Sequence, residues 1–455
     1  MDTKKLRQKI LDLAIRGKLV PQDPNDEPAS VLLERIRAEK EQLIKEGKIK
    51  RSKKSAASDT SHYENVPFEV PESWCWTTIG ELFQLQAGKF IEAPQISTCK
   101  DATHIYPCYG GNGLRGYVES YNRDGLFPII GRQGALCGNI NIAEGKFYAT
   151  EHAVVVETFA NIDIQLFVYF LIQLNLNQYA TATAQPGLAV KTINEVPIPL
   201  PPINEQHRIS MAIEKSLDTL SEIDQSKHAI RKSILQLKSR ILDLAISGKL
   251  AAQDCSDEPA LELLRRINPS FAPCDNRHYT NVPFSLPDTW LWASGKDLFL
   301  PMKNCKPSGE YFKYIDIDSL DNQDCVVKCP KVLPVTAAPS RATRCTKVGD
   351  ILFSMVRPYL KNIAMITESD CIASTGFYVC SPNKALLSKY CYYLMISPYV
   401  INGLSQFMKG DNSPSINNVH ISDWLYPLPP LNEQKRIVKK VDEVFRHLDS
   451  IVTEL

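Results

Sequence analysis

The feature that most constrains the fold of this chain is an internal repeat. The segment "PLPPINEQHRI" at residues 199–209 returns as "PLPPLNEQKRI" at 427–437. A second segment, "LRQKILDLAIRGKLVPQDPNDEPASVLLERI" at 6–36, returns as "LKSRILDLAISGKLAAQDCSDEPALELLRRI" at 237–267. Long segments that recur in one chain indicate two copies of one structural unit, so this repeat has to be explained before any local pattern.

The material between the repeated segments is different in the two copies. A third match joins "HYENVPFEVPESWCW" at 62–76 to "HYTNVPFSLPDTWLW" at 278–292. Beyond it, the stretches 77–198 and 293–426 cannot be aligned convincingly with each other. Repeated borders around unlike contents predict one scaffold that carries two different working surfaces.

The repeated motif predicts the start of a long helix. Asn204 follows two prolines and can cap the helix, and Glu205 suits its positive N-terminal end. Apolar residues then recur at steps of three and four in two runs separated by a polar patch, which is the pattern of a coiled-coil seam, up to a glycine that can end the helix. They are Ile209, Ile213, Leu217, Leu220, Ile230, Ile234, Leu237, Ile241 and Leu244, and the glycine is Gly248.

The second copy of this helix is divided between the two ends of the chain. Its first half begins at Ile437, and the chain ends within it at Leu455. The matching second half lies at the N-terminus, from Leu6 to Gly17. Joining the ends would regenerate the central block with about one helical turn missing. We therefore predict a two-unit cyclic repeat, opened in the middle of one helix.

These patterns predict an α/β (α+β) protein with two globular domains, separated by a pair of long antiparallel coiled-coil helices related by a pseudo-twofold axis. A helix of roughly 40 residues would be about 60 Å long. The expected boundaries are an N-terminal helical region at 1–60, a first variable domain at 61–198, a central region with the long helix at 199–275, a second variable domain at 276–427 and a C-terminal helix at 428–455.

Composition excludes some classes of protein and leaves others open. The chain has no apolar run of 18 residues and begins with a polar segment, so we expect a cytoplasmic protein with no membrane partner. Its net charge of +1 neither requires nor excludes nucleic acid. Of its 13 cysteines, only the pair in "CVVKC" at 325–329 is closely spaced. We favour reduced thiols and expect no metal site, with zinc at this pair as the alternative.

No catalytic constellation stands out in the sequence. "GGNGLRGYV" lacks the Lys-Ser/Thr of a phosphate-binding loop and favours tight turns. The Asn-Pro-Pro-aromatic tetrapeptide of adenine methyltransferases is absent, and "PDTW" at 287–290 is followed by no Glu-x-Lys. His104 and His152 each stand alone, which favours structural roles. We therefore expect no catalytic residue in this chain.

Basic residues in glycine-bearing or turn-like stretches are the candidate DNA contacts. Arginine and lysine in such loops can approach phosphates and read guanine edges, although each one alone could be a solvated surface charge. The candidates are Lys89, Arg115, Arg132 and Lys191 in the first variable stretch, and Lys303, Lys306, Arg341, Arg344, Arg357, Lys361 and Lys409 in the second. The tract "KEGKIKRSKK" at 45–54 is either a further phosphate contact or a solvated helix end.

Taken together, the "ILDLAI.GKL" blocks, the "VPFEVPESWCW" and "VPFSLPDTWLW" segments and both "PLPP.NEQ.RI" motifs resemble the specificity subunits of type I restriction-modification enzymes. The resemblance implies two target recognition domains, each binding one half of a split, asymmetric double-stranded DNA sequence, and paired helices that set the gap. It implies a non-catalytic chain with no cofactor of its own. Two modification subunits would bring S-adenosylmethionine, and two restriction subunits would use ATP and Mg.

Three other interpretations of the sequence stay open. The chain could be a helical scaffold for protein–protein assembly that reads no DNA. It could serve a different modification-nuclease protein through the same helical surface. A self-contained methyltransferase or nuclease is the third, and it would need a catalytic motif that the sequence does not show.

Overall fold

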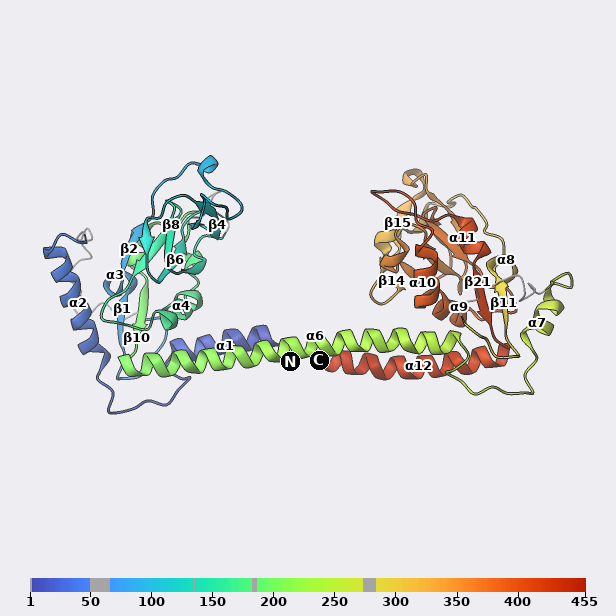
Figure 1. Ribbon diagram of the computed structural model, residues 1–455, viewed down its shortest axis with the longest axis horizontal. Coiled ribbons are helices and arrows are strands. Elements are labelled where there is room, and N and C mark those ends of the chain that lie inside the picture. Colours follow the sequence, from blue (N-terminus) through green and yellow to red (C-terminus); the bar gives the residue numbers. More distant parts are fainter. Residues whose placement is uncertain (1, 50–65, 135, 182–185, 273–283) are drawn as a thin grey trace. The chain divides into compact units, whose positions relative to one another are not determined.

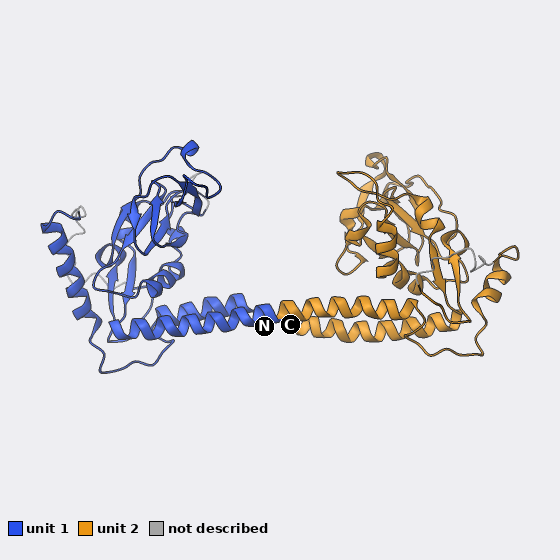
Figure 2. Ribbon diagram, viewed as in Figure 1, with its two compact units in different colours: residues 1–226 blue, residues 227–455 orange. Residues whose placement is uncertain are grey.

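The computed structural model describes residues 2–49, 66–134, 136–181, 186–272 and 284–455. The chain forms two compact units, residues 1–226 and 227–455 (Figure 2). The boundary falls inside one helix, α6 (Ile203–Ile246), whose first half belongs to unit 1 and whose second half belongs to unit 2. Each unit is therefore built as the repeat predicts, from the end of one long helix, a variable domain, and the start of another long helix.

Unit 1 places a mixed domain on a short helix pair (Figure 1). Before α6, its elements are α1 (Thr3–Ile15), α2 (Ala29–Lys45), β1 (Cys75–Thr78), α3 (Ile79–Leu82), β2 (Gln84–Ala87), η2 (Ala93–Gln95), β3 (Tyr106–Gly110), β4 (Gly113–Val118), β5 (Arg123–Asp124), β6 (Phe127–Gly131), β7 (Ile140–Ala143), β8 (Lys146–Ala149), β9 (Ala153–Glu157), α4 (Ile164–Gln173), η3 (Leu176–Tyr179), α5 (Val190–Asn194) and β10 (Pro197–Leu200). The strands form sheets in the orders β2-β9-β6-β7 and β4-β3-β8-β5, with the pair β1-β10 beside them.

Unit 2 repeats this plan with different strands. Its elements after α6 are α7 (Ala260–Ile267), β11 (Leu291–Ser294), α8 (Gly295–Leu298), β12 (Tyr311–Ile315), η4 (Ile317–Ser319), β13 (Leu320–Asp321), β14 (Val326–Val327), β15 (Lys331–Pro334), η5 (Val335–Ala337), β16 (Ala342–Cys345), β17 (Ile351–Ser354), η6 (Pro358–Leu360), β18 (Ile363–Met365), β19 (Cys371–Ser374), β20 (Phe377–Cys380), α9 (Ser388–Met395), α10 (Pro398–Ser405), α11 (Asn418–Asp423), β21 (Leu425–Leu428) and α12 (Leu431–Glu454). Its sheets run β18-β17-β20 and β15-β12-β19-β16, with the pairs β11-β21 and β13-β14.

A buried carboxylate explains why "NEQ" is repeated. Glu205, fully buried in the first turn of α6, accepts a hydrogen bond from the Trp74 indole at 2.9 Å and another from the Gln22 amide. Burial raises the pKa of this glutamate, and the two hydrogen bonds oppose that rise. Burying a charge is costly unless it is hydrogen bonded, so the acid needs both partners. The contact therefore joins three segments that lie far apart in the sequence.

Unit 2 contains the same contact, which we call the Glu–Trp–Gln clamp in both units. Glu433 accepts from the Trp290 indole at 2.9 Å and from Gln253. Next to each clamp an arginine of the long helix pairs with a buried aspartate, Arg208 with Asp26 and Arg436 with Asp257. The repeated letters of the sequence thus specify one polar junction, built twice.

The glutamine of the same motif connects the helix to the variable domain. Gln206 donates to the Pro201 carbonyl at 2.9 Å and accepts from the Asp163 backbone N–H at 3.0 Å, where α4 begins. Gln434 donates to the Pro429 carbonyl and accepts from the Leu387 N–H, where α9 begins. Both glutamines are fully buried. The variable domains are therefore attached to the helices at equivalent points.

The predicted helix cap is wrong in its details. α6 begins at Ile203, so Asn204 lies in the first turn, where its side chain together with Arg208 lowers the pKa of Asp26 by hydrogen bonding. In unit 2, Pro430 occupies the capping position of α12 and makes no side-chain cap bond. The prolines fix the backbone at the helix start, and the buried glutamate and glutamine connect the first turn to other segments.

The long helices pack antiparallel to their partners within each unit. In unit 1, Arg7 of α1 donates to Ser221 and Asp224 of α6, whereas Gln22 reaches Glu205 at the other end. In unit 2, α6 and α12 pair in the same way, with Lys238 contacting Asp449 and Gln253 contacting Glu433. The helix pairing within each unit therefore follows the prediction from the repeat.

Only some positions of the predicted apolar seam of α6 are buried. Ile209, Ile213, Leu220, Ile234 and Ile241 are buried, and Gly248 ends α6 with a positive φ of 73°. The other seam positions in the second half of α6 are exposed by 38–47%, namely Ile230, Leu237 and Leu244. There the buried face includes Leu242 and Ala245, because α12 and the domain core cover a face turned away from these three residues. Among the described helices, none is long and apolar enough to span a membrane.

We predict that Glu433→Ala destabilises unit 2 by about 1.5–3 kcal/mol, because it leaves the Trp290 and Gln253 donors without a buried acceptor. Denaturant unfolding followed by circular dichroism measures the shift. Glu443→Ala is the matched control, since Glu443 lies on the same helix and is exposed. Equal stability of the two variants would show that the clamp does not stabilise the unit.

Candidate nucleic-acid interface

A frame of backbone hydrogen bonds holds the loop after β6 in unit 1. The Arg132 N–H donates to the His152 carbonyl at 3.0 Å, and the Gly134 N–H donates to the Pro186 carbonyl at 3.0 Å. The Leu188 N–H in turn donates to the Arg132 carbonyl at 2.8 Å. Three loops distant in sequence are thus fixed to one another. Loops held in this way can present side chains to a ligand with little loss of entropy.

The same frame holds the loop after β17 in unit 2. The Met355 N–H donates to the Gly376 carbonyl and the Arg357 N–H to the Pro414 carbonyl, both at 2.9 Å, and the Ile416 N–H donates to the Met355 carbonyl. These bonds show which positions of the two variable domains are equivalent, although the sequences do not align. β6 pairs antiparallel with β9, which leads to α4, and β17 pairs antiparallel with β20, which leads to α9. Arg357 in unit 2 is the counterpart of Gly134 in unit 1.

A hollow of about 460 Å³ lies beside this frame in unit 1. It is lined by the β3–β4 turn from Gly110 to Arg115 and by Gln133, Gly134 and His152. Only glycine fits part of the floor, because a Cβ on Gly111 would lie 2.7 Å from the Gln133 carbonyl oxygen. A Cβ on Gly131 would lie 1.9 Å from the Gly111 oxygen. Backbone therefore forms much of the floor, and polar side chains stand at its rim.

Polar atoms without a partner are concentrated in the segment 132–152, from which His152 lines the hollow. Nine buried side-chain nitrogen or oxygen atoms of the described residues lack a hydrogen bond, and five of them belong to residues 132–152. They are Arg132 Nε, Asn141 Nδ2, Thr150 Oγ1, Glu151 Oε2 and His152 Nδ1. Each such group costs about 1–3 kcal/mol when it gives up water without gaining a protein partner. A concentration of them is typical of a site that a ligand or ordered water completes.

Of the four predicted basic residues of unit 1, one lines this hollow and two others lie in segments hydrogen bonded near it. Arg115 is exposed on β4 and lines it, half-buried Arg132 directly follows β6, and the Lys89 N–H donates to the Ala149 carbonyl beside Thr150. Lys191 is exposed on α5, so the expectation that it lies in a loop is wrong. Arg115 likewise lies in a strand. "GGNGLRGYV" forms the β3–β4 hairpin, as its tight turns suggest.

In unit 2 the structure divides the predicted basic residues. Arg341, Arg357 and Lys409 belong to segments that contact the frame. The Arg357 guanidinium donates to the Asn412 carbonyl at 2.7 Å, and Lys409 forms a backbone bridge with Ser415. The Arg341 carbonyl accepts from the N–H of Thr375, which precedes Gly376 of the frame. Arg344 lies in strand β16, not in a loop, and donates to Asn304, next to Lys303 and Lys306. Lys361 instead lines a hollow with residues of α6 and α12.

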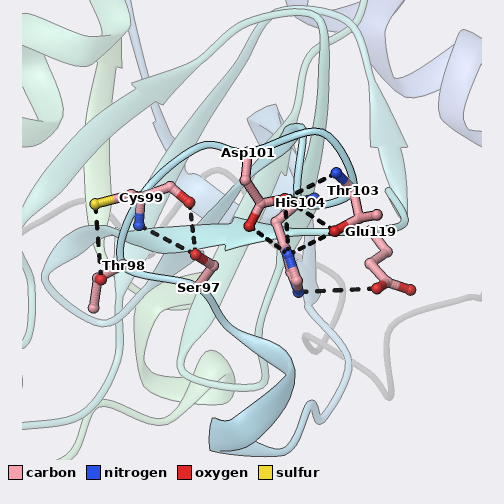
Figure 3. Close-up of polar contacts among 7 residues, drawn as sticks. All are labelled: Ser97, Thr98, Cys99, Asp101, Thr103, His104 and Glu119. Carbon is pink, nitrogen blue, oxygen red and sulfur yellow. Dashed lines mark hydrogen bonds and ion pairs between the residues drawn. The ribbon is translucent and has the colours of Figure 1, made fainter.

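An acidic turn adjoins the hairpin of unit 1 (Figure 3). Asp101 accepts from the backbone N–H groups of His104 and Thr103, which hold the pKa of this carboxyl well below its usual range. The His104 ring lies 2.9 Å from Asp101 and 3.9 Å from Glu119. Ser97 joins this loop to Tyr117 of β4 by two backbone hydrogen bonds. His104 therefore stabilises a turn, as its isolation in the sequence suggests.

The cysteine pair of "CVVKC" does not gather other ligands in the part of the chain that the structure describes. The Cys325 thiol is buried and contacts the Asn322 and Lys361 carbonyls, whereas Cys329 is exposed. No group of three or more His, Cys, Asp or Glu side chains comes together among the described residues. The basic tract at 45–54 lies partly outside those residues.

Uncharged polar residues also lie at these two frames, and the prediction from positive charge does not include them. Gln133 is exposed between the two ends of the unit 1 frame, and Asn112 is exposed in the hairpin turn. Asn412 contacts Arg357 in unit 2. Side-chain amides read base edges as arginines do, but a search for positive charge passes over them. The "GRQG" context of Gln133 was the available signal, and it pointed to Arg132.

Comparison with known proteins agrees with this arrangement. The model of the type I restriction modification DNA specificity domain matches residues 71–234 and 300–455, one match in each variable domain. The EcoEI specificity subunit of Escherichia coli is 30% identical over 99% of this chain and 90% of its own length. The EcoAI specificity subunit of Escherichia coli is 27% identical over 97% of this chain and 89% of its own.

A solved structure described as "Structural basis underlying complex assembly and conformational transition of the type I R-M system" contains a similar chain. It superposes with a TM-score of 0.58 over 85% of this chain and 94% of its own, at 16% identity, which shows the fold alone. The duplicated anchors, the two matched domains and the full-length similarity to EcoEI lead to one conclusion. The chain belongs to the type I restriction-modification DNA specificity family.

Proposed function

We propose that this chain is the specificity subunit of a type I restriction-modification complex, and that each unit binds one half of a bipartite, asymmetric double-stranded DNA target. The observation that carries this proposal is the duplicated loop frame. The same backbone bonds present Gln133 and Gly134 in unit 1 but Val356 and Arg357 in unit 2. Equal frames with unlike side chains suit two readers of unlike half-sites.

The proposal assigns the chemistry to partner subunits. Two modification subunits would bind S-adenosylmethionine and methylate an adenine in each half-site, and two restriction subunits would use ATP and Mg to cleave. This chain would contribute no catalytic residue and no cofactor. The length of α6, which belongs to both units, would set the unread gap between the half-sites.

Exposed apolar residues on α6 support a partner surface on the helices. Met211 is 58% exposed in unit 1, and Leu235 is 62% exposed in unit 2. Leu237 and Ile230, which the seam prediction had placed inside, are also exposed, on a different face of α6 from Leu235. Exposed apolar side chains on a helix are typical of interaction sites. We propose that the modification subunits bind here.

Methylome sequencing of a host that expresses this chain with its modification subunit tests the proposed function. We expect a motif with two unlike halves, methyladenine in both and a fixed gap. An assembled complex that methylates nothing new would contradict the proposal and favour a helical scaffold that reads no DNA.

Arg357→Ala should weaken binding of the specific DNA by about tenfold without dissociating the complex, because it removes a guanidinium that the frame of unit 2 presents. Fluorescence anisotropy with a labelled target measures affinity, and size-exclusion chromatography checks assembly. Lys328→Ala is the control, since Lys328 is an exposed lysine of the same unit that lies outside the frame. Unchanged affinity in the Arg357 variant, or an equal loss in both variants, would remove Arg357 from the proposed interface.

Leu235→Glu should reduce co-elution of the modification subunit and leave the melting temperature of the isolated chain nearly unchanged, because the side chain is exposed. Val332→Glu is the matched control, as Val332 is 65% exposed on β15. Normal co-elution of the Leu235 variant would place the partner surface elsewhere.

A further inference from the structure

We infer that the hollow beside the β3–β4 hairpin of unit 1 is an adenine-reading pocket, in which Gln133 is the specificity-determining side chain. This inference rests on the proposed function and makes it specific. It names one residue, one base and one half-site. It also differs from the interpretation of basic loops, because the reading group is an uncharged amide.

The position of Gln133 suits direct contact with a base. Its neighbours Arg132 and Gly134 are each fixed by a backbone hydrogen bond to another loop, and Gln133 itself bridges to Gly187. The backbone under Gln133 is therefore held from two sides, whereas its side chain is exposed. A flexible side chain on a fixed backbone can reach a base edge without reorganising the domain.

The shape of the hollow suits a flat ligand edge. Glycines line much of the hollow, namely Gly110, Gly111, Gly113 and Gly134, and a side chain at Gly111 would collide with the Gln133 carbonyl oxygen. Arg115 stands on the hairpin and lines the hollow. A cation beside an open floor suits a phosphate that flanks a base in DNA.

The chemistry of the rim favours adenine. A glutamine amide offers one donor and one acceptor side by side, which complements N7 and N6 of adenine in the major groove. The unpartnered Thr150 hydroxyl and Asn141 amide lie against the same turn, since Thr150 Oγ1 is 3.7 Å from a Cβ placed on Gly110 and Asn141 Oδ1 is 2.8 Å from one on Gly113. These groups complete a polar surface behind the reading residue.

Gln133→Ala, expressed with the modification subunit, tests the inference by methylome sequencing. We expect the motif to relax at a single position that is A·T in the wild-type motif, with discrimination there reduced by roughly 5- to 150-fold. Gln133→Glu should replace the preference for adenine by tolerance of cytosine, because a carboxylate can only accept, as from cytosine N4. Gln8→Ala, an exposed glutamine of α1 in the same unit, is the control and should leave the motif unchanged.

The outcomes separate this inference from the proposed function. A wild-type complex without any motif would contradict the proposed function. A wild-type bipartite motif that Gln133→Ala leaves intact would overturn the inference alone. So would an equal loss of affinity for all sequences, which indicates a phosphate contact. Gln133 and Arg357 belong to different units, so their variants should affect different half-sites. If Gln133→Ala and Arg357→Ala relaxed positions in the same half-site, the inference would also be overturned.

Discussion

A carboxylate buried in the first turn of a long helix is the interaction on which each unit depends. Glu205 and Glu433 are removed from water, and each is balanced by an indole N–H and an amide N–H from two other segments. A buried charge without these donors would be strongly unfavourable, so the helix start, the tryptophan segment and the glutamine segment must come together for any of them to be stable. This requirement explains why the "NEQ", "SW" or "TW" and "QD" letters all recur in both copies.

The clamp leaves the outer loops of the variable domains free to differ. It fixes the base of each domain, as do Gln206 and Gln434 through the first residues of α4 and α9. Above that base, the same backbone hydrogen bonds hold the loop frame in both units, and these bonds do not depend on side-chain identity. Gly134 and Arg357 can therefore occupy one structural position, and a new set of side chains can be presented without a new fold.

The candidate interface was only partly predictable because residue type and residue position are separate questions. Charge selected Lys89, Arg115 and Arg132, of which Arg115 lines the hollow. The same criterion selected Lys361, which the fold places beside the long helices. Gln133 lies in the same "GRQG" stretch as Arg132, but an uncharged amide there resembles any polar turn residue until its neighbours are known. The prediction that Leu237 is buried in the seam was wrong for a related reason. Periodicity shows that a helix has an apolar face, but it does not show which part of that face a neighbouring element covers.

The duplication, the pairing of helix ends within each unit and the family were all evident from the amino-acid sequence. These properties follow from long repeated segments and from buried polar contacts that only a few residue types can make. The tertiary structure decided the equivalence of the two variable domains and the choice of residues around the hollow. Those depend on backbone hydrogen bonds between loops such as 132–134 and 186–188, and every residue except proline carries the same donor and acceptor. Such bonds leave no trace in the identity of the residues that make them.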